Sequence, residues 1–286
     1  MAGGARTDPV LITGCSSGIG RAAAVSLHHA GRRVYATARR LDTLADLASR
    51  GIATMALDVT DEASMAAAVA AVEADAGAVG TLINNAGYGL YGPVEQVPMA
   101  EIRRQFETNF FGLVRLTQLV LPGMRKHRGG RILNVSSMGG PATLPGGAFY
   151  HASKYAVEAL SDALRMEVAQ FGIEVVLIEP GPVKTPWNDT AAGSLGDAAS
   201  GSGTDPYAAY KAAVGGSFSR TVSGPLARLG SDAQDIAKVI TRAVTAQRPR
   251  TRYLINPVAK GVVTMNRLLP GRAYDAVIRR QYGLPG

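Results

Sequence analysis

The fold is decided near the N-terminus by one stretch, Val10-Leu11-Ile12-Thr13-Gly14-Cys15-Ser16-Ser17-Gly18-Ile19-Gly20. Its first residues form a short apolar run, which predicts a buried strand, and residues 19–30 predict a helix that Gly31 ends. The three glycines allow a tight bend, close approach of the backbone to a pyrophosphate and close packing of the helix on a sheet. The helix N-terminus adds unpaired N–H groups and a positive dipole end, which favour phosphate. A glycine cluster alone is a weak signal, but the strand–turn–helix context predicts a dinucleotide-binding turn.

The rest of the chain continues this alternation of strands and helices. Apolar runs of strand length recur between stretches of helical periodicity, and glycines stop several of the helices. The pattern predicts an α/β fold with a doubly wound parallel sheet and helices on both faces, in a single domain over residues 1–286. The expected strands are 10–13, 34–38, 54–59, 81–84, 131–136, 173–179 and 251–255, and the expected helices are 19–30, 42–50, 61–76, 101–124, 149–171 and 232–245.

Composition excludes several classes of protein. The chain has 286 residues, of which 47% are hydrophobic and 18% charged, as in a folded globular protein and unlike a disordered chain. The single cysteine, Cys15, excludes an intramolecular disulfide and a zinc site with several cysteines. We expect no metal. No stretch has the roughly 18 consecutive apolar residues of a spanning helix, and residues 1–8 carry no apolar signal core, so we expect a cytoplasmic protein.

The end of the second expected strand bears on the choice of dinucleotide. In folds that select NAD, an acidic residue at this place binds the 2′-hydroxyl of the adenosine ribose. Here the sequence from Tyr35 to Arg40 reads Tyr-Ala-Thr-Ala-Arg-Arg, without an acid. The guanidinium of Arg39 suits a 2′-phosphate, because its fork of N–H groups matches phosphate oxygens. The sequence therefore favours NADP(H), with NAD(H) as the alternative.

A tyrosine and a lysine lie one helical turn apart at Tyr150 and Lys154, so both side chains lie on one face of the expected helix. The pKa of a free tyrosine, about 10, is too high for efficient proton transfer near neutrality, and a nearby ammonium lowers it. The pair alone is a weak signal. However, Ser137 follows the fifth expected strand, and Asn109 is a polar residue within the apolar helix 101–124. Ligands of parallel sheets bind at the carboxyl ends of strands, where Ser137 is expected.

Several motifs together make the chain resemble the short-chain dehydrogenase/reductase family, in its shorter, non-extended branch. The matching residues run in the family's order from residue 10 to residue 186, and the chain is similar to NADP-dependent hydroxysteroid and retinol dehydrogenases of the family. They are Thr13-Gly14-x-x-x-Gly18-x-Gly20, Asn84-Asn85-Ala86-Gly87, Asn109, Ser137, Tyr150-x-x-x-Lys154 and Pro180-Gly181-x-Val183-x-Thr185. Five or six motifs in register are far more specific than any one of them. The resemblance implies a Rossmann-type fold.

The resemblance also implies a role for each matching residue. Tyr150 would donate or accept the proton, Lys154 would lower the pKa of Tyr150 and bind the nicotinamide ribose, Ser137 would orient the substrate carbonyl, and Asn109 would hold a water in a proton relay. The remaining residues would bind the cofactor: Gly14, Ser17, Gly18, Ile19 and Gly20 at the pyrophosphate and adenosine; Arg39, Asp58 and Val59 at the adenosine end; Asn85, Ala86 and Gly87 beside them; and Pro180, Gly181, Val183 and Thr185 at the nicotinamide.

The predicted function is an NADP(H)-dependent oxidoreductase that interconverts a carbonyl and an alcohol, with Tyr150 as general acid or base. Apolar residues at the expected entrance suggest a hydrophobic ketone or alcohol as substrate; they are Tyr88, Leu90, Tyr91, Leu144, Phe149 and Trp187. The alternative is a non-catalytic protein that binds or senses NADP(H) on the same fold. A nucleic-acid partner rests on the net charge of +8 alone and is not expected.

Two segments lie outside these motifs. Residues 186–230 are expected to form a mobile substrate loop, because part of this segment is rich in Gly, Ala and Ser. Residues 248–286 hold eight basic residues and one acid, Asp275, so they carry almost all of the net charge. Apolar residues recur there at helical spacing, which predicts either contact with an anionic membrane surface or, as the favoured reading, a helix packed over the active site. A homodimer or homotetramer is expected through helices 101–124 and 149–171.

Overall fold

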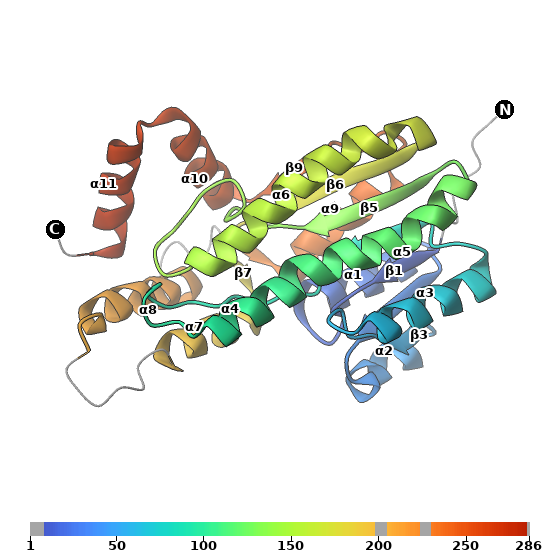
Figure 1. Cartoon of the computed structure of the whole chain (residues 1–286), viewed down its shortest axis with the longest axis horizontal. Coiled ribbons are helices and arrows are strands. Elements are labelled where there is room, and N and C mark those ends of the chain that lie inside the picture. Colours follow the sequence, from blue (N-terminus) through green and yellow to red (C-terminus); the bar gives the residue numbers. More distant parts are fainter. Residues whose placement is uncertain (1–8, 198–204, 224–229, 285–286) are drawn as a thin grey trace.

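A seven-stranded parallel sheet forms the centre of the molecule (Figure 1). The computed structural model describes residues 9–197, 205–223 and 230–284. The strand order β3-β2-β1-β4-β5-β6-β9, reversing beside β1, is that of a Rossmann-type fold and confirms the predicted class. The strands are β1 (Val10–Ile12), β2 (Val34–Ala38), β3 (Ala53–Ala56), β4 (Thr81–Asn84), β5 (Gly130–Val135), β6 (Ile173–Pro180) and β9 (Arg252–Ile255).

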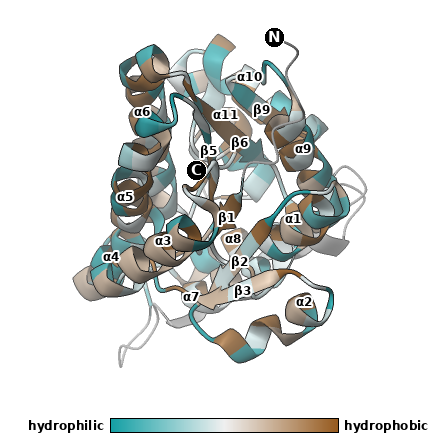
Figure 2. Ribbon diagram, turned by 90° about the vertical axis from the view of Figure 1, so that its right-hand side faces the viewer, coloured by the Kyte–Doolittle hydropathy of each residue, from teal (hydrophilic) through white to brown (hydrophobic). Residues whose placement is uncertain are grey.

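Helices cover both faces of the sheet, as Figure 2 shows with the sheet between two helical layers. One layer contains α1 (Gly18–His29), α2 (Ala45–Ser49), which continues the 3-10 turn η1 (Leu41–Leu44), and α9 (Ala233–Thr245). The other contains α3 (Glu62–Ala76), α4 (Met99–Phe106), α5 (Gly112–Lys126) and α6 (Ala148–Val168), which ends in the 3-10 turn η3 (Ala169–Phe171). Each face of the sheet buries its own apolar cluster, because strands of a parallel sheet are apolar on both sides.

The long helix expected over 101–124 is not continuous. A π-helical turn, η2 (Glu107–Phe111), separates α4 from α5 and contains Asn109. Such turns insert one extra residue into a helix and are frequent at functional sites. The buried amide of Asn109 bonds to the backbone of Tyr88, which compensates for the irregular helix geometry. Sequence periodicity does not reveal this turn, since the apolar pattern on both sides of it is helical.

The segment expected as a mobile loop forms two helices over most of its length. These are α7 (Trp187–Asp197) and α8 (Ala208–Ser223), and a short pair of strands, β7 (Val183–Lys184) with β8 (Ser231–Asp232), lies at the base of the segment. The prediction of a loop is therefore wrong here. Ala191, Leu195 and Val214 are buried against Tyr91 and Tyr150, so tertiary packing stabilises helices that the weak apolar pattern does not indicate. The predicted loop residues 198–204 and 224–229 lie outside the described residues.

The basic tail forms α10 (Pro257–Leu268) and α11 (Gly271–Tyr282), at the end of the molecule where α7 and α8 lie (Figure 1). Val262 and Val263 pack on Ala142, and the Tyr274 hydroxyl donates to the carbonyl of Thr143 at 3.0 Å. The tail thus packs over the loop between β5 and α6. One arginine of residues 248–286, Arg252, lies in β9 and pairs with three carboxylates. In the described parts of the chain, no helix is long and apolar enough to cross a bilayer.

Candidate active site

A cavity of about 750 Å³ opens at the carboxyl ends of the strands. Its lining joins the loops after β1, β3, β4, β5 and β6 to side chains of α6, which is the position expected for ligands of an open parallel sheet. Most of the predicted site residues meet there: Gly14, Ser17, Gly18, Ile19, Arg39, Asp58, Val59, Asn85, Ala86, Gly87, Ser137, Tyr150, Lys154, Pro180, Gly181, Val183 and Thr185. Gly20 and Asn109 are not among the lining residues.

The glycine turn is shaped by positive backbone angles. Gly14 has φ +72° and Gly18 has φ +57°, conformations that other residues adopt at a cost. A Cβ on Gly14 would lie 2.9 Å from the Cα of Ala86, so the turn and the loop after β4 touch through their backbones. The Asn85 amide fixes this contact by donating to the carbonyls of Thr13 at 2.9 Å and Gly14 at 3.1 Å. A Cβ on Gly20 would collide with Asn85 and Gly14, so Gly20 supports the turn by close packing.

The observed groups fit a dinucleotide. The turn leaves its backbone open beside the start of α1, and among the described residues no side chain caps that helix N-terminus. The dipole and N–H groups there favour phosphate. Arg39 is exposed at the cavity rim just beyond β2, where it can meet a 2′-phosphate. Asp58, also on the rim, accepts from the backbone and hydroxyl of Thr60 at 2.9 and 2.8 Å, so this carboxylate is engaged by its own loop.

Tyr150, Lys154 and Ser137 converge at the middle of the cavity. The Lys154 ammonium donates to the carbonyl of Val135 at 2.8 Å and lies 5.9 Å from the centre of the Tyr150 ring. Ser137, two residues after Val135, accepts from the backbone N–H of Gly139 at 3.0 Å and hydrogen-bonds the Tyr150 hydroxyl. The end of β5 therefore holds both groups that contact the tyrosine and lysine of α6.

Burial dominates the acid–base properties of this cluster. It raises the pKa of Tyr150 to about 12, and the hydrogen bond with Ser137 only partly opposes this. It lowers the pKa of Lys154 to about 8, opposed by the charge of Glu158. Burial outweighs the lowering effect of Ser137 here, and the lowering of the Tyr150 pKa by Lys154 stays a prediction. The rings of Tyr91 and Trp187, centred 6.0 and 5.1 Å from that of Tyr150, shield the hydroxyl from water.

Asn109 supports the site from behind the lining. Its side-chain amide donates to the Tyr88 carbonyl at 2.9 Å and to Ser153 at 3.3 Å, and its oxygen accepts from the Tyr88 N–H at 3.1 Å. A Cβ on Gly87 would lie 3.0 Å from that oxygen and 3.8 Å from the Lys154 ammonium. Asn109 thus fixes the loop after β4 close to Lys154, and its role in a water relay stays a prediction.

The far end of the cavity is aromatic and comes from distant segments. Tyr88, Tyr91, Leu144 and Trp187 line the cavity as predicted, and Trp187 both faces the cavity and anchors α7 through its ring contacts. Leu90 and Phe149 do not line it; the Leu90 backbone is instead bonded to Gln105 at 2.7 Å. Sequence reasoning missed Val214 of α8 and Tyr282 of α11, and their spacing gives no signal because tertiary packing alone brings these helices here.

Metal ligands and the single cysteine also bear on the chemistry. In the described residues, no three His, Cys, Asp or Glu side chains gather where they could bind a metal ion. Cys15 is buried, and burial raises the pKa of its thiol to about 12, so it stays protonated and unreactive near neutrality.

Comparison with known proteins identifies the family. A family model described as short chain dehydrogenase matches residues 8–195. The chain is 36% identical over 273 residues to the uncharacterized oxidoreductase YbbO of Escherichia coli K12, covering 94% of this chain and 93% of that one. It is 38% identical over 271 residues to retinol dehydrogenase 8 of Bos taurus, covering 90% and 83%.

Solved structures agree with these sequence matches. A short-chain dehydrogenase from Streptomyces avermitilis superimposes with a TM-score of 0.78 at 32% identity, covering 99% of this chain and 98% of that one. A serine dehydrogenase complexed with NADP+ gives 0.75 at 25% identity, covering 87% and 95%. A 3-ketoacyl-(acyl-carrier-protein) reductase from Brucella melitensis complexed with NADH gives 0.70 at 26% identity, covering 84% and 91%. The chain belongs to the short-chain dehydrogenase/reductase family and is an oxidoreductase of that family.

Proposed function

We propose that the protein is an NADP(H)-dependent oxidoreductase that interconverts a carbonyl and an alcohol. The observation that carries the proposal is the convergence of Tyr150, Ser137 and Lys154 in one cavity with the glycine turn. A bound nicotinamide supplies or accepts the hydride. The Tyr150 hydroxyl would donate a proton to the carbonyl oxygen during reduction, and its phenolate would take the proton from the alcohol during oxidation. Ser137 orients that oxygen, and Lys154 stabilises the phenolate form of Tyr150.

The residue that follows β2 supports NADP(H) over NAD(H). Arg39 stands at the cavity rim where an acid would bind a ribose 2′-hydroxyl, and its guanidinium matches a 2′-phosphate. A similar solved structure was complexed with NADP+, whereas another was complexed with NADH, so the family alone does not select the cofactor. The turn would hold the pyrophosphate through Ser17, Gly18 and Ile19.

The substrate class follows from the aromatic end of the cavity. Tyr91, Trp187, Val214 and Tyr282 present ring faces and an aliphatic side chain to the space beside Tyr150. Such a lining favours a hydrophobic ketone or alcohol, because it offers apolar area beside Tyr150. The similarity to retinol dehydrogenase 8 agrees with this choice.

The test is a spectrophotometric screen of NADPH and NADH against a panel of hydrophobic and small polar carbonyls and alcohols. We expect turnover with NADPH and hydrophobic carbonyls. Turnover of small polar ketones alone would overturn the substrate class. Tight NADPH binding without turnover of any compound would favour the alternative, a protein that only binds or senses the cofactor.

An oligomer is proposed through the outer faces of η2 and α6. Phe111 is 51% exposed, Tyr155 42% and Met166 75%, all on helices that stand side by side on one surface (Figure 1). Large apolar side chains exposed together are typical of an interface between subunits. Light scattering should give a dimer or tetramer, and Met166→Glu together with Phe111→Glu should dissociate it; a monomeric wild-type protein would contradict the proposal.

Contact with an anionic lipid surface is proposed at the corner between α10 and α11. Leu268 is 76% exposed and Leu269 36%, with the exposed Arg267 and Arg272 on either side. Apolar and basic side chains together favour an anionic bilayer surface. Wild-type protein should sediment with anionic vesicles. A smaller fraction of the double variant Leu268→Asp and Leu269→Asp should sediment with them. Equal recovery of both proteins would contradict this contact.

A further inference from the structure

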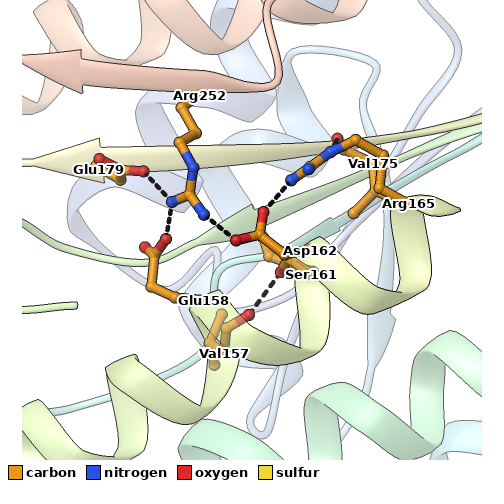
Figure 3. A network of polar contacts seen from close by, with 9 residues as sticks. Val157, Glu158, Ser161, Asp162, Arg165, Val175, Glu179 and Arg252 are labelled. Carbon is orange, nitrogen blue, oxygen red and sulfur yellow. Dashed lines mark hydrogen bonds and ion pairs between the residues drawn. The ribbon is translucent and has the colours of Figure 1, made fainter. Parts of the chain in front are cut away.

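A network of ion pairs joins α6 to β6 and β9 (Figure 3), and within it Glu158 and Glu179 are buried while Asp162 is half exposed. Its centre is Arg252 of β9, whose guanidinium contacts Glu158 and Asp162 of α6 and, at 2.8 Å, Glu179 of β6. Asp162 also pairs with Arg165 at 2.6 Å. Arg252 therefore links the helix that holds Tyr150 and Lys154 to the strand that leads into the nicotinamide loop at Pro180.

The charges in this network do not balance by themselves. Glu158 is 7% exposed and Glu179 2%, and together with Asp162 they place three carboxylates against the two guanidinium groups of Arg252 and Arg165. The Asp162 side chain is 45% exposed, so the buried imbalance is that of Glu158 and Glu179 against Arg252. An uncompensated buried charge is costly. A further cation, Lys154, is 6% exposed and lies one turn before Glu158 on the same face of α6.

Glu158 and Lys154 both contact the end of β5 or the residues that follow it. A Cβ on Gly140 would lie 2.6 Å from the Ser136 hydroxyl and 2.8 Å from a carboxylate oxygen of Glu158, so these two side chains share the space that the glycine leaves. Ser136 follows Val135, whose carbonyl accepts from Lys154. The Glu158 carboxylate thus sits behind the strand end that binds Lys154.

We propose that Glu158 is a positioning residue that keeps Lys154 in its ammonium form, and that Arg252 holds Glu158 charged and in place for this task. The proposal rests on the proposed role of Lys154. The titratable groups around the ammonium are Tyr150 and Glu158 of α6, while β5 offers a carbonyl and η2 the amide of Asn109. Behind Glu158 stand Glu179 of β6 and Arg252 of β9.

The direction of the effect follows from burial. Burial lowers the pKa of Lys154, and the negative charge of Glu158 raises it. Burial and the neighbouring Glu179 raise the pKa of Glu158, while Ser136 and Arg252 lower it. Without Arg252, Glu158 would take up a proton and its support of Lys154 would be lost. Removing the carboxylate directly should have the same effect on Lys154 without leaving an unpaired acid.

The test compares Glu158→Gln with Asp162→Asn, which lies in the same network but has a side chain 45% exposed. Lysine labelled with ¹³C at Cε is titrated by NMR in the protein without cofactor, and the Lys154 signal is assigned by its absence in Lys154→Met. We expect the titration midpoint of Lys154 to fall by about one pH unit or more in Glu158→Gln. In Asp162→Asn it should stay near the wild-type midpoint. An unchanged midpoint in Glu158→Gln would overturn the proposal.

Activity and stability give independent readouts. The alkaline limb of the kcat/KM profile should move to lower pH in Glu158→Gln by the same amount as the NMR midpoint. Arg252→Lys, which keeps the charge, should shift this alkaline limb less than Arg252→Gln does. Adding Glu158→Gln to Arg252→Gln should recover stability but should not restore the wild-type pH profile. If the network had only a structural role, the variants would lower the melting temperature and leave the NMR and kcat/KM midpoints unchanged. The NMR titration needs no turnover. If the protein proved inactive, the proposed function would be contradicted, but the titration would still test whether Glu158 controls the protonation of Lys154.

Discussion

The cavity has two ends that are built in different ways. The glycine end, formed by Gly14, Gly18 and Asn85, is a contact between backbones, in which a single added Cβ meets the next loop. The aromatic end, formed by Tyr91, Trp187 and Tyr282, is a contact between side chains of helices far apart in sequence. Backbone contacts tolerate almost no substitution, whereas packed side chains can be exchanged at modest cost. The first end is therefore fixed for one ligand, and the second can be retuned for another.

Tyr150 lies between the two ends and is the proposed proton donor, so its loss should have the largest effect. Tyr150→Phe keeps the ring packed against Tyr91 and removes the proton donor. We expect turnover to fall by about 10²–10⁴-fold, as for loss of a general acid, with cofactor affinity nearly unchanged. Steady-state kinetics and a fluorescence titration with NADPH measure the two quantities. Tyr155→Phe, on the outer side of the same helix, is the control, and comparable turnover in both variants would contradict the assignment.

The raised pKa of Tyr150 predicts opposite pH dependences for the two directions. Alcohol oxidation needs the phenolate, and with a pKa of about 12 that form is scarce near neutrality. Oxidation should therefore speed up with increasing pH, by up to about tenfold per unit until Lys154 loses its charge, whereas carbonyl reduction should not. Initial rates in both directions from pH 6 to 9 measure this. An oxidation rate independent of pH would show that the tyrosine is already ionised in the working complex.

Adding one methyl group at the glycine end should break it. Gly14→Ala combines a positive φ with a contact to Ala86, and we expect it to lower the free energy of unfolding by about 2 kcal/mol and to abolish cofactor binding. Gly31→Ala is the matched control, because φ there is +74° and nothing lies within 4 Å. It should cost about 1 kcal/mol and leave binding intact. Equal losses in the two variants, measured by urea unfolding, would mean that the backbone contact contributes nothing.

Arg39 should affect the choice of cofactor more than the fold. Arg39→Ala removes a charge-assisted contact to a 2′-phosphate, so the KM for NADPH should rise about tenfold while that for NADH stays the same. Arg40→Ala, which changes a neighbouring exposed arginine outside the cavity lining, should alter neither constant. A parallel rise for both cofactors would argue against recognition of the 2′-phosphate.

The smallest effect is expected at the aromatic end. Trp187→Leu keeps an apolar side chain, so the protein should remain folded and bind cofactor normally. The KM for hydrophobic substrates should rise about threefold to tenfold, with a smaller change in kcat. Met99→Ala, an exposed residue of α4, serves as the control. If Trp187→Leu lost cofactor binding, as Gly14→Ala is expected to, the aromatic end would contribute to cofactor binding and the two ends would not act independently.

The same contrast explains what the sequence could predict. The glycine turn, the order of strands and the meeting of Tyr150, Lys154 and Ser137 depend on local patterns and on the geometry of parallel sheets. The helices α7 and α8, and the presence of Tyr282 in the cavity, depend on tertiary packing that no spacing reveals. The π turn at Asn109 and the network of Arg252 were missed because periodicity does not report buried polar partners.

The position of Tyr282 has a consequence for how the protein is made. The sheet strands and the glycine end precede α11 in the chain, so during synthesis they emerge from the ribosome first. A prematurely ended chain that stops after β9 has every strand of the sheet and the glycine turn, yet lacks one wall of the chamber beside Tyr150. Tyr150 would be less shielded in such a chain than in the full-length protein.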